Sequence, residues 1–179
     1  MELTEKLKKR KLTKDDIEVR VAQVGTGWIS LLLYKNARVD MNILDELFGV
    51  ENWKREHKEL KGNIYCGISI YDPTKKEWIT KWDCGTESNT EKEKGESSDS
   101  FKRSAVCFGI GRELYSSPAI IIPEFDKEKN PNYEVVEKNG KKNVKTRFKV
   151  YAIEINDNKE ITGLTIINNK DKKVFFWKG

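Results

Sequence analysis

The sequence is poor in the residues that carry most metal, redox and hydrolytic chemistry. It contains one histidine, His57, and only three cysteines, Cys66, Cys84 and Cys107, which lie far apart in the chain. An odd number of widely spaced cysteines is not a disulfide framework, and no Cys-x-x-Cys pair offers half of a zinc site, which needs about four ligands. We therefore expect reduced, mostly buried thiols and no bound metal.

Two common catalytic motifs are also missing. The segment Gly25-Thr26-Gly27 is not followed by Gly-Lys-Ser or Gly-Lys-Thr, so it is not a phosphate-binding P-loop. No Gly-x-Ser-x-Gly segment supplies a nucleophile that His57 could activate. The sequence gives no sign of a bound cofactor, and we expect none.

Long apolar runs are absent as well. No stretch approaches the ~20 apolar residues of a membrane-spanning helix, and the first 16 residues lack the apolar run of a signal peptide. Five tryptophans and an apolar content of 37% are nevertheless enough for a folded core in a chain of 179 residues. We expect a soluble cytoplasmic protein, in a bacterial host cell, without a membrane partner.

The net charge of +5 is distributed unevenly. Residues 1–132 carry 23 basic and 23 acidic side chains, whereas residues 133–179 carry 11 basic and 6 acidic ones. A nucleic-acid site in the first part must therefore be a local groove. The positive balance of the last part could support contact with duplex or single-stranded DNA, although lysines on sheet edges also protect against aggregation.

Hydrophobic periodicity predicts an α+β fold that begins with a β-hairpin and a short helix. The hairpin joins an alternating strand at 17–24 to a returning strand at 28–34 through a glycine-rich turn. Asn36 as N-cap and Gly49 just after the last turn delimit a helix at about 37–48.

Two further groups of strands are predicted. The first is an antiparallel β-meander with strands at 53–60, 64–71 and 77–84. The second is a small C-terminal antiparallel β-module with strands at 133–136, 144–155, 161–167 and 173–177. The expected organisation is a basic N-terminal arm at 1–16, a core at 17–120, a linker at 121–132 and the β-module at 133–179.

The segment 83–115, DCGTESNTEKEKGESSDSFKRSAVCFGIGRELY, is the most informative. It opens at a strand end, crosses a polar loop and continues as a helix with Phe101, Ala105 and Phe108 on one face. We expect residues 97–99 to be N-caps or first-turn residues. Lys102 and Arg103 lie off the apolar face, where an ordinary solvated surface with an Asp99–Arg103 ion pair would explain them.

Three segments in this order resemble the Rad-fifty-two family of single-strand annealing proteins: ARVDMNILDELFGVENW, WDCGTES and SSDSFKRSAVCFGIGRELY. The resemblance covers about residues 34–118 and is greatest to the short bacteriophage branch, often called Sak. It implies a β-β-β-α core in which the meander packs on the long helix. It also implies ATP-independent binding of single-stranded DNA and annealing of complementary strands in homologous recombination and repair, without bond-making or bond-breaking chemistry.

The resemblance also implies which side chains hold DNA. In this family a basic residue in the first turn of the shorter helix lines an inner DNA groove, and Arg38 is the matching position. Lys102 and Arg103 would line the same groove, with Lys94 and Arg112 as weaker candidates. For Arg38 the alternative is a surface arginine paired to an acid.

A second DNA site is implied at the tip of the meander. Lys75 and Lys76 loosely match the basic hairpin of the family's outer site, although an ordinary polar turn explains them equally well. The aromatic residues Tyr65, Tyr71 and Trp78 could stack on bases, but packing across the sheet is the stronger interpretation.

One protomer could grip only a few nucleotides, so annealing favours a homo-oligomeric ring or filament. The resemblance implies a ring in which the meander of one protomer meets the helix of the next, and Glu91, Glu93 and Glu96 could pair with lysines of a neighbour. The expected partners are single-stranded DNA, further copies of the chain, double-stranded DNA and a host or phage single-strand-binding protein. No long C-terminal tail of the kind that recruits a recombinase is expected.

Two alternatives remain open. A single-strand-binding protein that protects DNA without annealing it would use the same groove. A metal-dependent nuclease could hold Mg²⁺ through Asp83, Glu87, Glu91 and Glu93, although acids near the start of a helix are also favourable to its dipole. The nuclease ranks below annealing, because the usual acid-spacer-lysine signature on a strand is missing.

Overall fold

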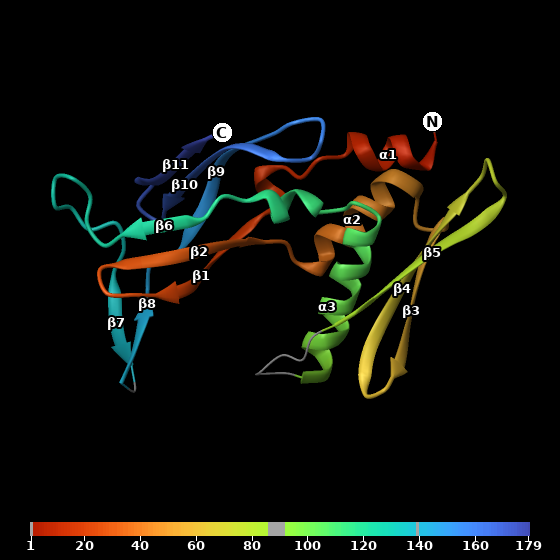
Figure 1. Cartoon of the computed structure of the whole chain (residues 1–179), viewed down its shortest axis with the longest axis horizontal. Coiled ribbons are helices and arrows are strands. Elements are labelled where there is room, and N and C mark those ends of the chain that lie inside the picture. Colours follow the sequence, from red (N-terminus) through yellow and green to blue (C-terminus); the bar gives the residue numbers. More distant parts are fainter. Residues whose placement is uncertain (1, 86–91, 139) are drawn as a thin grey trace. The chain divides into compact units, whose positions relative to one another are not determined.

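The computed structural model describes residues 2–85, 92–138 and 140–179. These residues form two compact units that alternate along the chain, one made of Met1–Lys11 and Lys35–Arg112 and the other of Leu12–Tyr34 and Glu113–Gly179. The fold is α+β and its sheets are antiparallel, as the sequence predicts (Figure 1). Two 3₁₀ helices, η1 (Lys14–Asp16) and η2 (Arg112–Ser116), complete the elements.

The first unit is built on the predicted β-β-β-α core. Its three-stranded meander consists of β3 (Trp53–Leu60), β4 (Asn63–Asp72) and β5 (Glu77–Cys84), with β4 in the centre. The long helix α3 (Lys92–Cys107) packs along one face of this sheet (Figure 1). That face carries the alternating apolar residues Cys66, Ile68 and Ile70 of β4, which are fully buried beneath α3.

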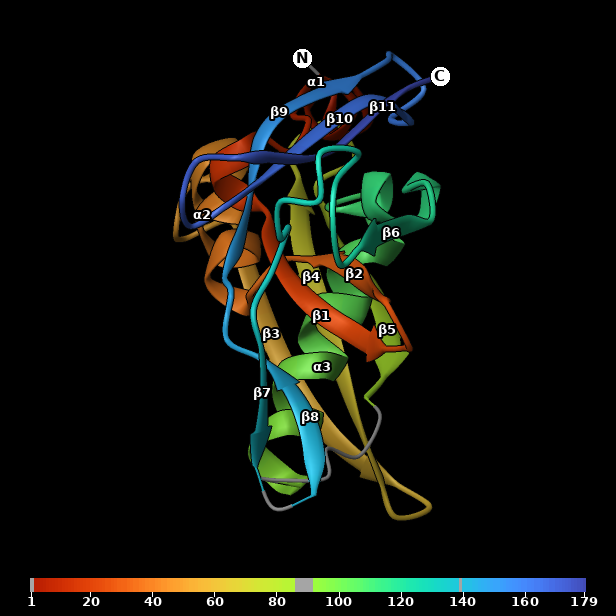
Figure 2. The ribbon, with the colours of Figure 1, turned by 90° about the vertical axis from the view of Figure 1, so that its left-hand side faces the viewer.

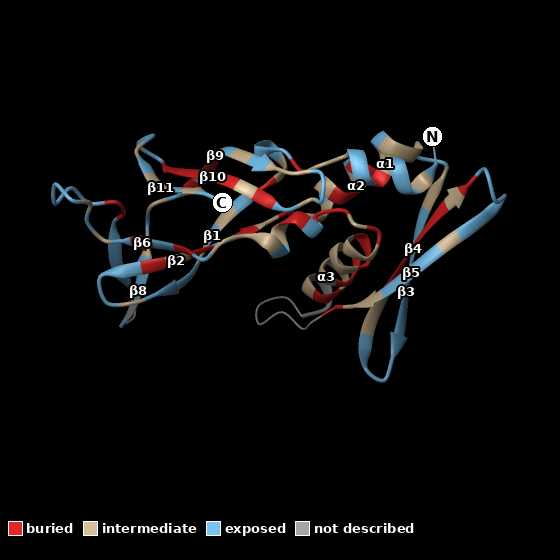
Figure 3. Ribbon diagram, turned by 45° about the horizontal axis from the view of Figure 1, so that its top comes forward, coloured by how far each residue is buried: buried red, intermediate tan, exposed pale blue. Residues whose placement is uncertain are grey.

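Helix α3 has the apolar face that the sequence predicts, but it begins earlier. Phe101, Ala105 and Phe108 are buried, and the buried side of α3 is visible in Figure 3. The chain is already helical at Lys92, so residues 97–99 lie inside the helix and the expectation that they cap it is wrong. Glutamate and lysine are good helix formers, so the charged segment before Ser97 extends the helix.

The helix α2 (Ala37–Phe48) has the predicted ends. The Asn36 side chain accepts hydrogen bonds from the backbone N–H groups of Arg38, at 2.9 Å, and Val39, at 3.3 Å. Gly49 follows the last turn with φ of 80°, a conformation that glycine adopts without steric cost.

The basic N-terminal segment includes a helix, α1 (Leu3–Lys9), that docks on the end of α2. Lys6 Nζ donates to the backbone oxygen of Leu47 at 3.0 Å, where a cation is favourable beside the last carbonyls of a helix. Arg10 pairs with Glu46 at 2.9 Å. These contacts fix a segment that the sequence predicted only as a basic arm.

The second unit is a six-stranded sheet in the order β11-β10-β9-β1-β2-β6. Its strands are β1 (Glu18–Val24), β2 (Trp28–Tyr34), β6 (Ile120–Pro123), β9 (Phe148–Ile155), β10 (Ile161–Asn168) and β11 (Lys173–Lys178). β10 is buried along nearly its whole length (Figure 3).

The C-terminal strands are antiparallel, as predicted, and they join the hairpin of β1 and β2 in one sheet. β9 pairs with β1, and β6 starts at Ile120 and pairs with β2, inside the segment expected to be a linker. The predicted hairpin buries the alternating residues Ile29, Leu31 and Leu33 of β2, an apolar face too large for two strands to cover alone.

The predicted strand at 144–155 is instead two elements. A separate hairpin of β7 (Val135–Lys138) and β8 (Lys141–Val144) precedes β9, as Figure 2 shows. Residues 145–147 connect β8 to β9 without strand structure.

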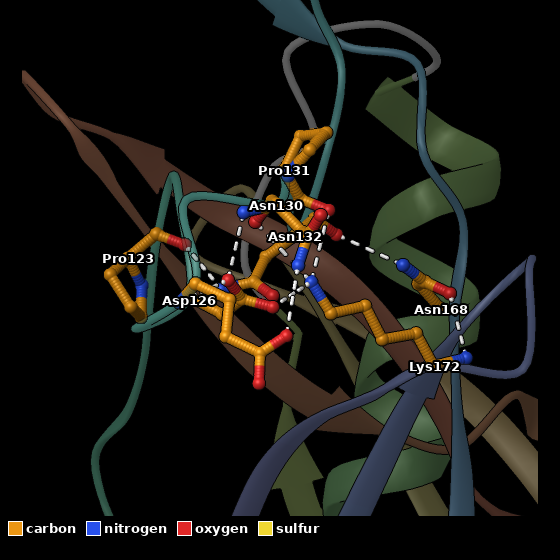
Figure 4. Close-up of polar contacts among 8 residues, drawn as sticks. Pro123, Asp126, Asn130, Pro131, Asn132, Asn168 and Lys172 are labelled. Carbon is orange, nitrogen blue, oxygen red and sulfur yellow. Dashed lines mark hydrogen bonds and ion pairs between the residues drawn. The ribbon is translucent and has the colours of Figure 1, made fainter.

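A network of amides and one ion pair joins the loop after β6 to the turn between β10 and β11 (Figure 4). The Asn168 amide donates to the Asn132 backbone oxygen at 3.1 Å, and its oxygen accepts from the backbone N–H groups of Lys170 and Lys172. Lys172 Nζ lies 2.8 Å from the Asp126 carboxylate. This hydrogen bond, with a further one from the Asn130 N–H, lowers the pKa of Asp126 to about 2.

Replacing Asn168 by alanine should destabilise the second unit. Asn168 is buried and makes three hydrogen bonds, so its loss leaves buried backbone groups without partners, at a cost of about 2–3 kcal/mol. Chemical denaturation followed by circular dichroism measures this. Exchange of the exposed neighbour Asn169 for alanine is the matched control, and equal stability of the two variants would contradict the role of the network.

Candidate nucleic-acid interface

The structure brings the first turn of α2 close to the middle of α3, where the sequence placed Arg38 and Lys102. Arg38 is exposed, and within the described residues its side chain has no acidic partner. Lys102 lies near enough to Asp40, two residues after Arg38, for its positive charge to lower the pKa of that carboxyl group. Arg38 and Lys102 therefore belong to two helices that contact each other within the first unit.

Lys102 and Arg103 each face an acid, but not in the pairing expected from sequence. Lys102 Nζ lies 3.8 Å from Asp99 one turn earlier, whereas Arg103 Nε lies 3.5 Å from Asp83 on the neighbouring strand β5. The Arg103 side chain is still 43% exposed, so its ion pair with Asp83 is weakened by water. Weak ion pairs therefore orient both cations, and a phosphate group could take the place of the carboxylate in each pair.

A buried ion pair lies beneath this surface. The Lys35 ammonium group contacts the Asp40 carboxylate, and both side chains are almost completely buried, with exposed fractions of 4% and 0%. Burial raises the pKa of Asp40 to about 6, although the charge of Lys35 opposes the rise. The second carboxylate oxygen of Asp40 has no hydrogen-bond partner within the described residues.

Gly111 explains why the sequence Phe-Gly-Ile-Gly follows α3. Its φ is 76°, and a β-carbon at this position would lie 2.0 Å from Cε of Lys35. Only glycine therefore lets the chain pass over the lysine stem. Sequence reasoning found this motif but missed Lys35 and Asp40, because a lysine before a helix gives no sign of burial.

Arg112 lies at the C-terminal end of α3. Its guanidinium group donates to the backbone oxygens of Val106, at 3.0 Å, and Cys107, at 3.4 Å. Lys81 Nζ donates to the same Cys107 oxygen at 2.7 Å. Two cations thus satisfy the free carbonyl groups and the negative dipole end of the helix.

Exchange of Arg112 for alanine should lower the stability of the first unit by about 1 kcal/mol, because α3 loses one of its two C-terminal cations. The affinity for single-stranded DNA should change less than two-fold. Thermal melting and DNA titration of one preparation measure both. A large loss of affinity at unchanged stability would instead place Arg112 in the DNA groove.

Lys94 belongs to α3, but its side chain lies outside the described residues. Lys75 and Lys76 form the exposed turn between β4 and β5, where the Asp72 carboxylate accepts the backbone N–H groups of Thr74 and Lys75. Lys76 has φ of 57°, and Lys75 lies 4.0 Å from Glu77. The turn is thus a stable platform for two lysines away from α3.

The meander face opposite α3 carries tryptophans covered by lysines. Lys54 Nζ lies 4.8 Å from the centre of the Trp78 ring, and Lys58 Nζ lies 4.6 Å from that of Trp82. Trp82 lies flat across Gly67, where a β-carbon would clash with its ring. The two tryptophans remain 43% and 38% exposed. The four-residue spacing of Lys54 and Lys58 in WKREHKEL places both on one face of a strand and is the sequence signal for this arrangement, which sequence reasoning missed.

The aromatic residues named as base-stacking candidates lie on that same face. The rings of Tyr71 and Trp78 contact each other across β4 and β5 at 5.4 Å between centroids. They pack across the sheet, the interpretation that sequence reasoning preferred, and Trp78 also keeps an exposed edge.

Among the described residues, the acidic side chains around the start of α3 make contacts within the fold. Asp83 accepts the Cys84 N–H at 2.7 Å in addition to its ion pair. Glu96 is buried and accepts the Ile64 N–H at 2.7 Å, so the idea that it pairs with a neighbouring protomer is wrong. Glu87, Glu91 and the side chain of Glu93 lie outside the described residues.

His57, the only histidine, bridges β3 and α3. Its ring nitrogen Nε2 lies 3.3 Å from the backbone oxygen and 3.2 Å from the hydroxyl group of Ser97. In the part of the chain that the structure describes, no group of three His, Cys, Asp or Glu side chains could hold a metal ion. No described helix is long and apolar enough to cross a membrane.

Comparison with known proteins supplies one match. Residues 1–133 match the family model described as Rad52/22 family double-strand break repair protein. This span contains α1, α2, the meander, α3 and the surface that carries Arg38, Lys102 and Arg103. No curated protein sequence matches the chain.

Proposed function

The chain belongs to the Rad52/22 family of double-strand break repair proteins, and we propose that it binds single-stranded DNA and anneals complementary strands without ATP. The observation that carries the proposal is the family match over residues 1–133, which includes the whole β-β-β-α core. The basic residues Arg38 on α2 and Lys102 and Arg103 on α3, two helices that contact each other, support it further. On the three segments that resemble the Sak branch, we also propose a bacteriophage origin and a bacterial host.

Annealing requires a protein that holds the sugar-phosphate backbone and leaves the base edges free. Arg38, Lys102 and Arg103 suit this task because cations that neutralise phosphates release counterions and bind without regard to sequence. The weak pairs of Lys102 with Asp99 and of Arg103 with Asp83 keep these cations extended before DNA arrives. The second strand is then tested by base pairing alone.

We propose further that protomers assemble into a ring or filament, so that several such grooves align along one strand. The meander face with Trp78 and Trp82 supports this proposal, because two partly exposed tryptophans on one sheet provide an apolar contact surface. Their covering lysines, Lys54 and Lys58, would have to move or find acidic partners in the neighbour.

The proposed function is tested by mixing two complementary labelled oligonucleotides with the protein in the absence of ATP, with and without Mg²⁺, across a salt series. We expect annealing to be faster with the protein, to slow as salt rises, and to leave both strands intact. Binding without faster annealing would instead indicate a protective single-strand binder. Strands shortened only in Mg²⁺ would indicate a nuclease and redirect attention to Asp83.

A further inference from the structure

The excess positive charge of the chain lies after residue 132, and the structure gathers part of it around two cavities of the second unit. One cavity, of about 370 Å³, is lined by Lys145, Arg147 and Lys170 among polar residues that include Asn132 and Asn168. The other, of about 450 Å³, lies against β1 and the start of β9. Thr146 and Arg147 line both, so the two cavities adjoin at the connection between β8 and β9.

The charges that line these cavities are mostly positive. Four cations, Lys145, Arg147, Lys149 and Lys170, stand against the two carboxylates Glu18 and Glu134. Lys145 lies 3.8 Å from Glu134, and Lys149 lies 3.1 Å from Asp171. Within residues 2–85, 92–138 and 140–179, no acidic side chain pairs with Arg147 or Lys170. These two cations are therefore available to an anion.

The walls that carry the two available cations are fixed by hydrogen bonds. On one side the Asn168 side chain, whose contacts with Asn132 and Lys172 are drawn in Figure 4, accepts the Lys170 N–H at 3.0 Å. On the other side the Thr146 hydroxyl accepts the Glu134 N–H at 2.8 Å, and the Lys145 N–H donates to the Glu134 backbone oxygen at 3.0 Å. Ordered walls lower the entropy that the backbone would lose when it binds a ligand.

The lining also indicates which anion fits. Its aromatic residues, Tyr133 and Phe148, are buried and offer no exposed ring on which an unpaired base could stack. Cations without a stacking platform recognise phosphate groups alone. A DNA duplex, whose bases are already stacked on each other, presents phosphate groups along its surface and needs no aromatic platform.

We propose that the surface around Arg147, formed by Lys145, Arg147, Lys149 and Lys170, is a further DNA site, distinct from the one implied at Lys75 and Lys76, and that it binds the phosphate backbone of duplex DNA. All four of these residues lie outside residues 1–133, the span that matches the family model, and none belongs to α2 or α3. It would hold the duplex product, or the duplex beside a single-stranded end, while the first unit holds the unpaired strand.

The test is the affinity of the full chain for a short labelled duplex across a salt series. The Arg147→Ala plus Lys170→Ala double variant should lose at least ten-fold in duplex affinity, and the slope of log K against log salt should fall by about 2. Its affinity for single-stranded DNA and its initial annealing rate should stay within two-fold of those of the unchanged chain. Lys127→Ala plus Lys178→Ala removes the same charge from exposed positions that line neither cavity and should change duplex affinity little.

A second variant is expected to change the duplex affinity in the opposite direction. Its result can be read even if the Arg147→Ala plus Lys170→Ala variant does not fold. Glu134→Gln removes the only carboxylate that lines the 370 Å³ cavity and should tighten duplex binding. Equal losses in the double variant and its control, or loss of single-strand but not duplex affinity, would overturn the proposal. If the chain fails to anneal complementary strands but its duplex binding still depends on Arg147, the proposed annealing function is contradicted and the proposed duplex site is supported.

Discussion

Replacement of Lys102 and Arg103 together by alanine is expected to lower the affinity for single-stranded DNA about 100-fold and to abolish annealing at protein concentrations that saturate the unchanged chain. Each side chain lost removes one charge-assisted contact to phosphate, worth about 1.5 kcal/mol. The slope of log affinity against log salt should fall by about 1.4, since two contacts to a single strand contribute ~0.7 each. Fluorescence anisotropy of a labelled oligonucleotide measures both quantities.

The variant should remain folded, because its two partners are partly exposed. Asp99 and Asp83 each keep about 30% of their side-chain surface in water, so neither becomes a buried unpaired charge. The control Lys127→Ala plus Lys178→Ala removes an equal charge from the second unit and should bind single strands almost normally. Normal binding by the Lys102→Ala plus Arg103→Ala variant would show that α3 does not line the groove.

The parts of this surface that the sequence predicts are those fixed by local geometry. The Asn36 side chain and the backbone conformation of Gly49 delimit α2, because each acts on groups only a few residues away in the chain. Phe101, Ala105 and Phe108 define the buried face of α3 because a helix repeats every ~3.6 residues. The periodicity therefore also gives the side of α3 on which Lys102 and Arg103 lie.

What the sequence does not predict depends on contacts between distant segments. Arg103 pairs with Asp83 on β5 rather than with Asp99, because the helix lies across that strand. The C-terminal strands join β1 and β2 by hydrogen bonding along the edges of the hairpin, a pairing of distant segments that no local pattern contains. Arg112 caps α3 because its guanidinium group reaches back to the backbone oxygens of Val106 and Cys107.

The ion pair of Lys35 and Asp40 is likewise a contact that the sequence does not predict. Removing only one of its two partners should have the largest effect on stability. Lys35→Ala leaves the buried Asp40 carboxylate without its only described hydrogen-bond donor, which should cost about 3–5 kcal/mol. Lys35→Met plus Asp40→Leu replaces both charges by apolar groups of similar size and should be close to neutral. Denaturation of the two single variants and the double variant gives the coupling between the residues.

The pH dependence supplies an independent check with a defined sign. The pKa of Asp40 is raised from 3.8 to about 6 by burial, so between these pH values the folded chain holds a proton that the unfolded chain has released. The stability that Asp40 contributes is therefore greatest below pH 4 and is lost as the pH rises through 6, by roughly 3 kcal/mol in total. The double variant should therefore gain stability relative to the unchanged chain as the pH rises over this interval. A constant difference in stability would mean that burial does not raise the pKa of Asp40.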